Sequence, residues 1–268
     1  HLSIRRQRQM CIRDRLTLPH YLSQQGYQTF GTGKWHNGAA SFEATFQEGE
    51  NVFLGGMSNH FEVPCQNLMT NGKLGEKSYK QFSTDLFTDA AISFLEKQAD
   101  QNPQDPFFCY VAFTAPHDPR SPAASYSSQL ETQKVPLPGN FLPYPTFKFD
   151  NFNVRDETLA PWPRTTEIIQ SSLAEYYALI EHIDDRLAAI IETLKKTGAY
   201  ENTIIIYAAD NGLAIGSHGL LGKQNLYEHS TKVPLIISGP GIPKNEVKVA
   251  LVYLCLLYTS PSPRDVEE

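Results

Sequence analysis

The 268-residue chain lacks the features by which several classes of protein are recognised. No run reaches the ~18 uninterrupted apolar residues of a membrane-spanning helix. Charged residues make up only 19% and form no long block of one sign, which argues against a disordered acidic tail or a protein that coats nucleic acid. Four cysteines and no internal repeat exclude a dense disulfide framework and a repeat array. A hydrophobic content of 41% and a net charge of -6 therefore predict a mildly acidic globular protein with a sizeable core.

The two ends of the chain do not resemble the part between them. Residues 10–14 can be written in codons whose opposite strand, in a shifted frame, encodes residues 255–259. Both peptides resemble translated sequencing adapters, so we expect residues 1–15 and 255–268 to be artefacts that flank a genuine segment, 16–254. A real basic arm and a real proline-rich tail are the alternative. Without the end segments, Cys65 and Cys109 remain, and we expect both to be buried thiols.

Apolar periodicity and strand-like runs alternate along the interior. Helical spacing predicts helices over residues 16–25, 83–98 and 165–197, with Ser83 or Thr84 as the cap of the second. Apolar, β-branched and aromatic runs predict a short strand at 27–30, a strand covered on both faces at 107–113, and further buried strands at 203–208 and 233–238. Residues 39–80 and 121–163 read as irregular, the latter as a long surface loop. The alternation predicts an α/β fold with a mostly parallel central sheet and helices on both faces.

Polar side chains follow three of the predicted strands. Lys34 and His36 come after the first, His117 after the second, and Asp210 with Asn211 after the third. In an open α/β sheet, ligands bind beyond the carboxyl ends of the strands. We therefore expect these side chains to meet at one edge of the sheet, together with Lys223, which lies in the next loop.

The types of these residues suit a site that binds a divalent cation and an anionic substrate. Asp210 and Asn211 are hard oxygen ligands, which suit Ca²⁺ or Mg²⁺ better than Zn²⁺. Two ligands do not make a site, and the run Asp-Asn-Gly is equally good chemistry for a turn that closes a strand. Lys34 and Lys223 lie in glycine-flanked loops and can bind an oxyanion whose charge grows in the transition state, although each can also be an ordinary solvated lysine.

Two histidines are candidates for proton transfer. His36 and His117 can act as acid, base or orienting donor, and a structural histidine is the alternative for each. Pro116 restricts the backbone where His117 leaves its strand, which favours a functional role for that histidine. His218 and His229 are weaker candidates.

Taken in order, these motifs resemble the formylglycine-dependent sulfatases of the alkaline-phosphatase superfamily. The matching segments are residues 26–36, 113–117, 209–212, 218–223, 227–230 and 233–241. The resemblance implies an alkaline-phosphatase-like fold, a hydrolase of sulfate esters such as those of carbohydrates, and one bound divalent cation, usually Ca²⁺. It implies a sulfated small molecule or glycan as the partner and a periplasmic or extracellular location, and the composition adds the expectation of no nucleic-acid partner and no membrane span.

The resemblance also assigns roles to residues. Asp210 and Asn211 would bind the metal, and Lys34 and Lys223 would hold the sulfate oxygens. His36 would orient or deprotonate the nucleophile, and His117 would contact the substrate and protonate the leaving alcohol.

The chain departs from the family at the nucleophile. The family oxidises a Cys or Ser to formylglycine in a Cys/Ser-x-Pro-x-Arg motif ahead of the Gly-Lys-Trp-His segment, and the 268 residues contain no such motif and no earlier acidic pair of metal ligands. We therefore expect residues 16–254 to be part of a sulfatase catalytic domain that is inactive as given. Two alternatives remain: a phosphoester or phosphonate hydrolase of the same superfamily, and a non-catalytic protein that binds sulfated glycans through Lys34 and Lys223.

Overall fold

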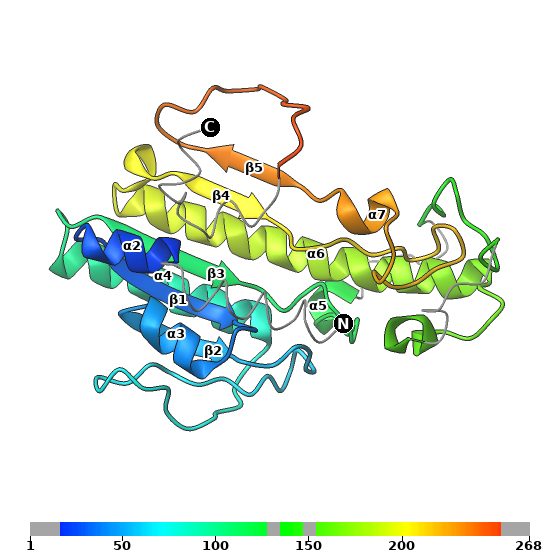
Figure 1. Ribbon diagram of the computed structural model, residues 1–268, viewed down its shortest axis with the longest axis horizontal. Helices are drawn as coiled ribbons and strands as arrows, with labels where there is room; N and C mark the ends of the chain where they lie inside the picture. Colours follow the sequence, from blue (N-terminus) through cyan, green and yellow to red (C-terminus); the bar gives the residue numbers. More distant parts are fainter. Residues whose placement is uncertain (1–16, 128–134, 147–153, 253–268) are drawn as a thin grey trace, which may run out of the picture. The chain divides into compact units, whose positions relative to one another are not determined.

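The computed structural model describes residues 17–127, 135–146 and 154–252 (Figure 1). Both segments expected to derive from adapters, 1–15 and 255–268, lie outside the described residues. The chain forms two compact units. Of the described residues, 17–119, 183–201 and 245–252 belong to unit 1, and 120–127, 135–146, 154–182 and 202–244 belong to unit 2. The longest helix, α6 (Thr166–Lys196), contributes its first half to unit 2 and its second half to unit 1.

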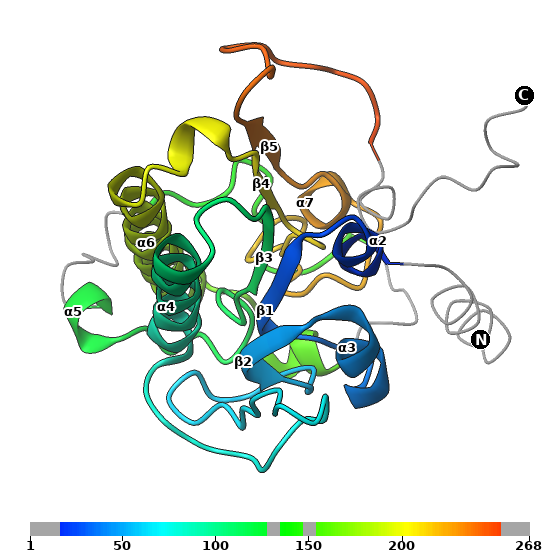
Figure 2. The ribbon, with the colours of Figure 1, turned by 90° about the vertical axis from the view of Figure 1, so that its left-hand side faces the viewer.

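Unit 1 is built around a three-stranded parallel sheet in the order β2-β1-β3. Its strands are β1 (Gln28–Lys34), β2 (Glu48–Phe53) and β3 (Phe107–Ala112). Helix α4 (Ser83–Gln101) covers one face of the sheet, whereas α2 (Leu18–Gln24) and α3 (Ala39–Thr45) cover the other (Figure 2). The predicted α/β class, with a parallel sheet between helices, is confirmed.

The prediction of irregular structure over residues 39–80 is wrong, because this stretch contains both α3 and β2. The packing of Phe42 explains why the sequence concealed them. A Cβ atom placed on Gly31 or Gly49 would lie 2.9 or 2.6 Å from the Phe42 ring, so the helix rests directly on two glycines of adjacent strands. Glycine weakens a strand pattern in the sequence. Here it permits the close contact that holds helix and sheet together.

The start of α4 also differs from the prediction. Phe82 is the N-cap residue and makes no side-chain capping bond, so neither Ser83 nor Thr84 caps the helix. The Ser83 side chain is instead fully buried and hydrogen-bonded to Thr114, just beyond β3. The hydroxyl thus joins the helix to the loop that follows the strand.

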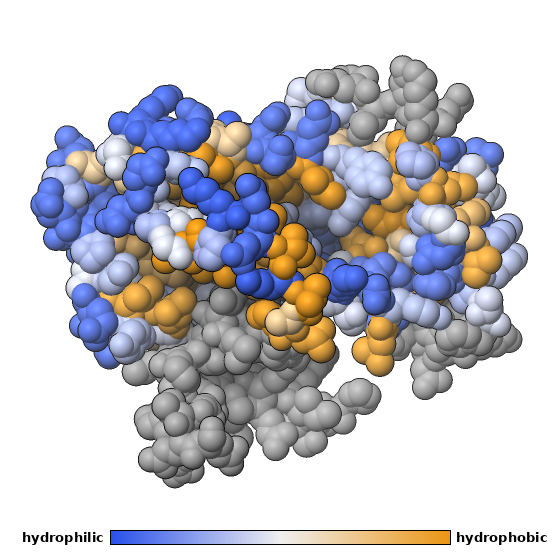
Figure 3. Space-filling view, turned by 90° about the horizontal axis from the view of Figure 1, so that it is seen from above, coloured by the Kyte–Doolittle hydropathy of each residue, from blue (hydrophilic) through white to orange (hydrophobic). Residues whose placement is uncertain are grey.

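Unit 2 contains a separate two-stranded antiparallel sheet formed by β4 (Ile205–Ala208) and β5 (Leu235–Ser238). Both strands were predicted, but they were expected to be buried. Ile206 is 48% exposed and Ile236 59% exposed. Figure 3 shows apolar side chains in orange between polar ones on the face seen from above. A β-branched run predicts a strand, whereas its burial depends on which segments pack over it.

The remaining elements are short. They are α5 (Ala124–Ser127), η2 (Arg155–Leu159), η3 (Tyr200–Asn202) and α7 (Glu228–Thr231). The core of unit 2 lies between the first half of α6 and the loop after β4, where Ile169 and Leu173 pack against Ile215 and Leu221. In the described part of the chain, no helix combines the length and the apolar character needed to cross a bilayer.

Candidate functional site

Trp35 anchors the first pair of candidate residues at the end of β1. Its indole is 6% exposed and makes edge-to-face contacts with Phe42 and Phe46, and its backbone N–H donates to the carbonyl of Phe53 at 2.7 Å. Lys34, the last residue of β1, is half-buried, and His36 is exposed. The buried indole therefore fixes the backbone on which both side chains stand.

Gly56 makes room for the His36 imidazole. A Cβ atom on Gly56 would lie 3.1 Å from Cε1 of His36, a tighter contact than side chains normally accept. Gly56 lies in the loop after β2. This loop therefore packs against His36, which follows the neighbouring strand β1. A side chain at position 56 would have to displace the imidazole.

His117 leaves the same edge of the sheet as Lys34 and His36. Strands β1 and β3 are parallel neighbours, and their last paired residues are Gly33 and Ala112. Because the carboxyl ends of parallel strands point the same way, both loops emerge at one edge. The structure thus brings three of the six candidate residues together within unit 1.

A hydrogen bond to the neighbouring backbone holds the His117 ring. Its Nδ1 lies 3.0 Å from the carbonyl oxygen of Asp118. A carbonyl only accepts, so Nδ1 carries the proton in this bond. In the neutral ring, Nε2 then carries no proton.

His60 contacts this loop and was missed in the sequence, where it lay in the stretch expected to be irregular. It is fully buried. Its Nδ1 lies 3.2 Å from the hydroxyls of Ser83 and Thr114, and its Nε2 lies 3.0 Å from the carbonyl oxygen of His117. No periodicity marks such a residue, because its partners are 23, 54 and 57 positions away.

In unit 2, Asp210 and Asn211 follow β4 directly. Asp210 is exposed and Asn211 half-buried, and within the described residues neither side chain makes a hydrogen bond. An Asx turn requires the side-chain oxygen to accept a nearby backbone N–H. Within the described residues neither side chain makes that bond, so Asp210 and Asn211 do not form an Asx turn here.

Gly212 holds the Asp-Asn pair against the segment that contains His229. Its N–H donates to the carbonyl of Ser230 at 3.0 Å, and an added Cβ would lie 2.0 Å from the carbonyl oxygen of His229. The glycine is thus required by a close approach of two backbones.

Lys223 lies beside the same loop. Backbone bonds from Ala214 to Gly222 (3.1 Å) and from Gly216 to Leu220 (2.7 Å) fold the chain back on itself. This ladder brings Lys223, which is half-buried, next to the residues that follow Asn211. Asp210, Asn211 and Lys223 are therefore gathered by local structure within unit 2.

A buried ion pair supports the Lys223 loop and was also missed in the sequence. The carboxylate of Glu157 accepts the backbone N–H groups of Leu221 and Gly222 at 3.0 and 2.8 Å. Arg164 pairs with it at 3.1 Å and lies over the Trp162 ring at 3.7 Å. Each charge finds its partner through the fold, so the sequence offers no signal for the pair.

His218 and His229, the weaker candidates, have structural environments. His218 stacks on Tyr227 with ring centroids 4.1 Å apart, and its Nε2 lies 3.0 Å from the amide nitrogen of Asn140. Burial, with a smaller effect from His218, lowers the pKa of His229 to about 4. A histidine that stays neutral at ordinary pH is a poor proton donor.

The described residues do not supply a full metal site: among them, no three His, Cys, Asp or Glu side chains lie close enough together to hold an ion. Asp210 and Asn211 have the oxygen donors that a hard cation prefers. They fit such an ion as part of a donor set and are too few to hold it alone.

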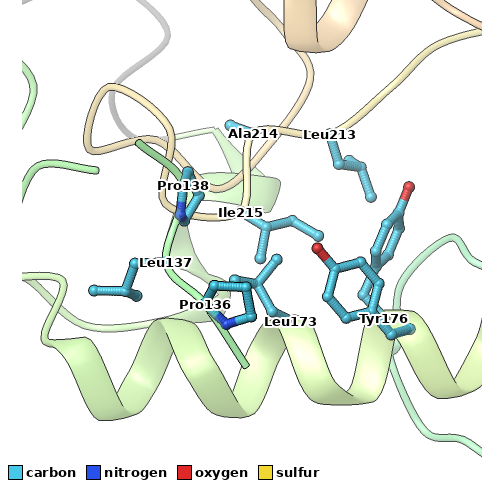
Figure 4. A pocket seen from close by; sticks show the side chains of 9 residues that line it. Pro136, Leu137, Pro138, Leu173, Tyr176, Leu213, Ala214 and Ile215 are labelled. Atoms are coloured by element: carbon cyan, nitrogen blue, oxygen red, sulfur yellow. The ribbon is translucent and has the colours of Figure 1, made fainter. Parts of the chain in front are cut away.

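A hollow of about 310 Å³ lies in unit 2 beside the loop after Asn211 (Figure 4). Leu213, Ala214 and Ile215 form one wall, and Leu173 and Tyr176 of α6 lie opposite. Its lining is mainly apolar, and it continues the unit's core.

Comparison with known proteins decides the family. The family described as Sulfatase matches residues 11–254. The chain belongs to the sulfatase family. This sulfatase is 29% identical over 251 residues to human N-acetylglucosamine-6-sulfatase, covering 90% of the chain and 44% of the relative. It is 28% identical over 282 residues to a sulfatase from Formosa agariphila, covering 95% and 53%. The chain spans about half the length of these relatives.

Solved structures support the same fold. A protein solved in complex with its substrate D-glucosamine-2-N,6-O-disulfate matches with a TM-score of 0.66 and 24% identity, over 85% of the sulfatase chain and 56% of that chain. The phosphonate monoester hydrolase of Silicibacter pomeroyi matches with a TM-score of 0.58 and 21% identity, over 82% and 52%. The alkaline-phosphatase-like fold is thus shared by sulfatases and phosphonate hydrolases.

Proposed function

We propose that the full-length protein hydrolyses sulfate esters of carbohydrates, and that this chain supplies the groups that bind the sulfate and protonate the leaving oxygen. The observation that carries the proposal is the emergence of Lys34, His36 and His117 from neighbouring parallel strands at one edge. A cation and two imidazoles beyond the carboxyl ends of strands suit an anionic ester.

In this proposal, Lys34 and Lys223 bind the non-bridging sulfate oxygens, whose charge grows as the ester bond breaks. Doubly protonated His117, whose Nδ1–H donates to the carbonyl of Asp118, gives the proton on Nε2 to the departing oxygen, so that an alcohol leaves instead of an alkoxide and the ring returns to its Nδ1–H form. His36 orients or deprotonates the nucleophile. Asp210 and Asn211 contribute to binding one Ca²⁺, which supplies further positive charge beside the sulfate when it is bound.

The nucleophile is the part that these residues do not provide. The 268 residues contain no Cys/Ser-x-Pro-x-Arg motif, in which the family forms formylglycine. We therefore propose that residues 16–254 are part of a catalytic domain and that this chain alone does not turn over substrate.

The substrate class is proposed from the relatives. One is named N-acetylglucosamine-6-sulfatase, and a structural neighbour was solved with a disulfated glucosamine as its substrate. A sulfated amino sugar is therefore the first substrate to test. Relatives from Caenorhabditis elegans and Drosophila melanogaster are named extracellular sulfatases, which supports action in the periplasm or outside the cell.

The test uses the full-length enzyme with its formylglycine confirmed by mass spectrometry. We expect release of sulfate from N-acetylglucosamine 6-sulfate and from 4-nitrophenyl sulfate. We expect Lys34→Ala to lower kcat/KM by about 100-fold or more, as removal of an oxyanion donor does. Lys196→Ala, an exposed position at the end of α6, serves as the matched control. Cleavage of a phosphonate monoester without sulfate release would replace the proposal with its phosphonate alternative.

A further inference from the structure

We propose that His60 is a positioning residue that holds the loop of His117 in its working conformation. This inference rests on the proposed function, in which His117 protonates the leaving group. His60 does not take part in the chemistry itself. It acts through the backbone of His117, because its Nε2 lies 3.0 Å from the carbonyl oxygen of that residue.

The contact with His117 places a proton on Nε2 of His60. The carbonyl of His117 can only accept, so Nε2 of His60 carries a proton. The hydroxyl of Thr114 donates to the hydroxyl of Ser83 at 2.8 Å. The Ser83 hydroxyl then has its own proton to donate to Nδ1 of His60, 3.2 Å away. These contacts fit a His60 ring that carries its proton on Nε2 and accepts the Ser83 proton at Nδ1.

The network is buried throughout. His60 and Ser83 are fully buried, and Thr114 is 6% exposed. Burial strengthens such hydrogen bonds and makes an unpaired member costly, so the arrangement is well defined. His60 therefore connects three segments: the start of α4 at Ser83, the end of the β3 segment at Thr114, and the loop at His117.

The position of the His117 ring depends on this connection. The amide N–H of His117 donates to the backbone carbonyl of Thr114 at 3.1 Å, and the N–H at its ring Nδ1 donates to the carbonyl of Asp118. Both bonds depend on the backbone torsions of His117. The N–H at Nε2 of His60 stabilises these torsions because it donates to the carbonyl oxygen of His117. Loss of that donor would release the carbonyl, and the ring would lose its fixed tautomer.

The first experiment measures imidazole ¹⁵N shifts of the ¹⁵N-histidine-labelled chain, which reveal the tautomer of each ring without turnover. We expect His60 in the Nε2–H form and His117 in the Nδ1–H form. In His60→Leu, the signal of His117 should move toward a mixture of tautomers. In His60→Gln, whose amide can donate to the same carbonyl, it should return toward the wild-type position. His20→Leu, on α2, is the control and should leave His117 unchanged.

Two results would overturn the proposal: His60 in the Nδ1–H form, or His117 signals in His60→Leu that match the wild type. If His60→Leu does not fold, the comparison of Thr114→Val with His60→Gln tests the proposal instead. Thr114→Val removes the hydroxyl that orients the Ser83 proton, so it should disturb His117 more than His60→Gln does. Unchanged His117 shifts in Thr114→Val would overturn the proposal equally.

Kinetics of the full-length enzyme provide a second test. A variant that only lowered stability would lower kcat equally on every substrate. A sugar alcohol needs a proton as it leaves, whereas 4-nitrophenolate does not. We expect His60→Leu to lower kcat on N-acetylglucosamine 6-sulfate at least tenfold more than on 4-nitrophenyl sulfate, with KM little changed. An equal loss on both substrates would contradict the role of His60. A wild-type enzyme that releases no sulfate would refute the proposed function. The ¹⁵N shifts of His117 would still test whether His60 positions its ring, because they are measured without turnover.

Discussion

Glu157 and Arg164 form an ion pair of 3.1 Å in which both side chains are buried, and the same carboxylate accepts two backbone N–H groups of the loop that leads to Lys223. Removal of one partner from such a pair leaves a buried charge without compensation. The pair therefore determines both the stability of unit 2 and the placement of a lysine proposed to bind sulfate.

We expect Glu157→Gln to lower the free energy of unfolding by about 3–5 kcal/mol, because Arg164 then remains buried without a countercharge. Urea denaturation followed by circular dichroism measures the change. Glu96→Gln, at an exposed position of α4, is the matched control and should change stability by less than about 0.5 kcal/mol. A Glu157→Gln protein as stable as the control would show that the pair does not hold the loop.

The second prediction concerns the glycine after Asn211. We expect Gly212→Ala to cost about 1–3 kcal/mol or more, since its Cβ would lie 2.0 Å from a backbone oxygen that cannot move independently. Gly139→Ala is the control, because nothing lies within 4 Å of a Cβ at that position. Equal urea midpoints for the two variants would contradict the close approach of the two backbones.

The third prediction is a pH dependence of stability. Burial and His218 lower the pKa of His229 to about 4, below the ~6.5 of an unfolded histidine. The unfolded chain then binds more protons between these values, so the contribution of His229 to stability is present above about pH 6.5 and is lost as the pH falls toward 4. His229→Gln should flatten this part of the profile, whereas His20→Gln should not. Urea midpoints between pH 4 and 7 measure it, and parallel profiles for wild type and His229→Gln would disprove it.

The fourth prediction concerns the thiols. Cys65 is buried as expected, whereas Cys109 is half-buried, and burial raises the pKa of each thiol to about 12. Since the thiolate is the reactive form, neither should react with a disulfide reagent at pH 8 in the folded protein. A Cys11→Ser, Cys255→Ser variant isolates these two thiols, and both should react once guanidinium unfolds it. Rapid labelling under native conditions would show that they are accessible.

Two kinds of feature can be predicted from the amino-acid sequence: elements encoded by neighbouring residues, and a family marked by several motifs in a fixed order. Helices α4 and α6 and strands β1 and β3 were predicted because apolar spacing and β-branched runs are read over neighbouring residues. The sulfatase family was recognised because several short motifs occur in one order along the chain, and the family match over residues 11–254 confirms it.

Features that depend on partners far along the chain follow only from how the chain folds. Strand β2 exists because it pairs with β1 beneath the Phe42 ring, although its own sequence is a weak strand. His60 and Glu157 acquire their roles from groups 54 and 64 positions away, and the antiparallel pairing of β4 with β5 arises when the chain between them turns back. Hydrogen bonds and ion pairs of this kind leave no periodicity in the sequence, because only folding brings their members within reach.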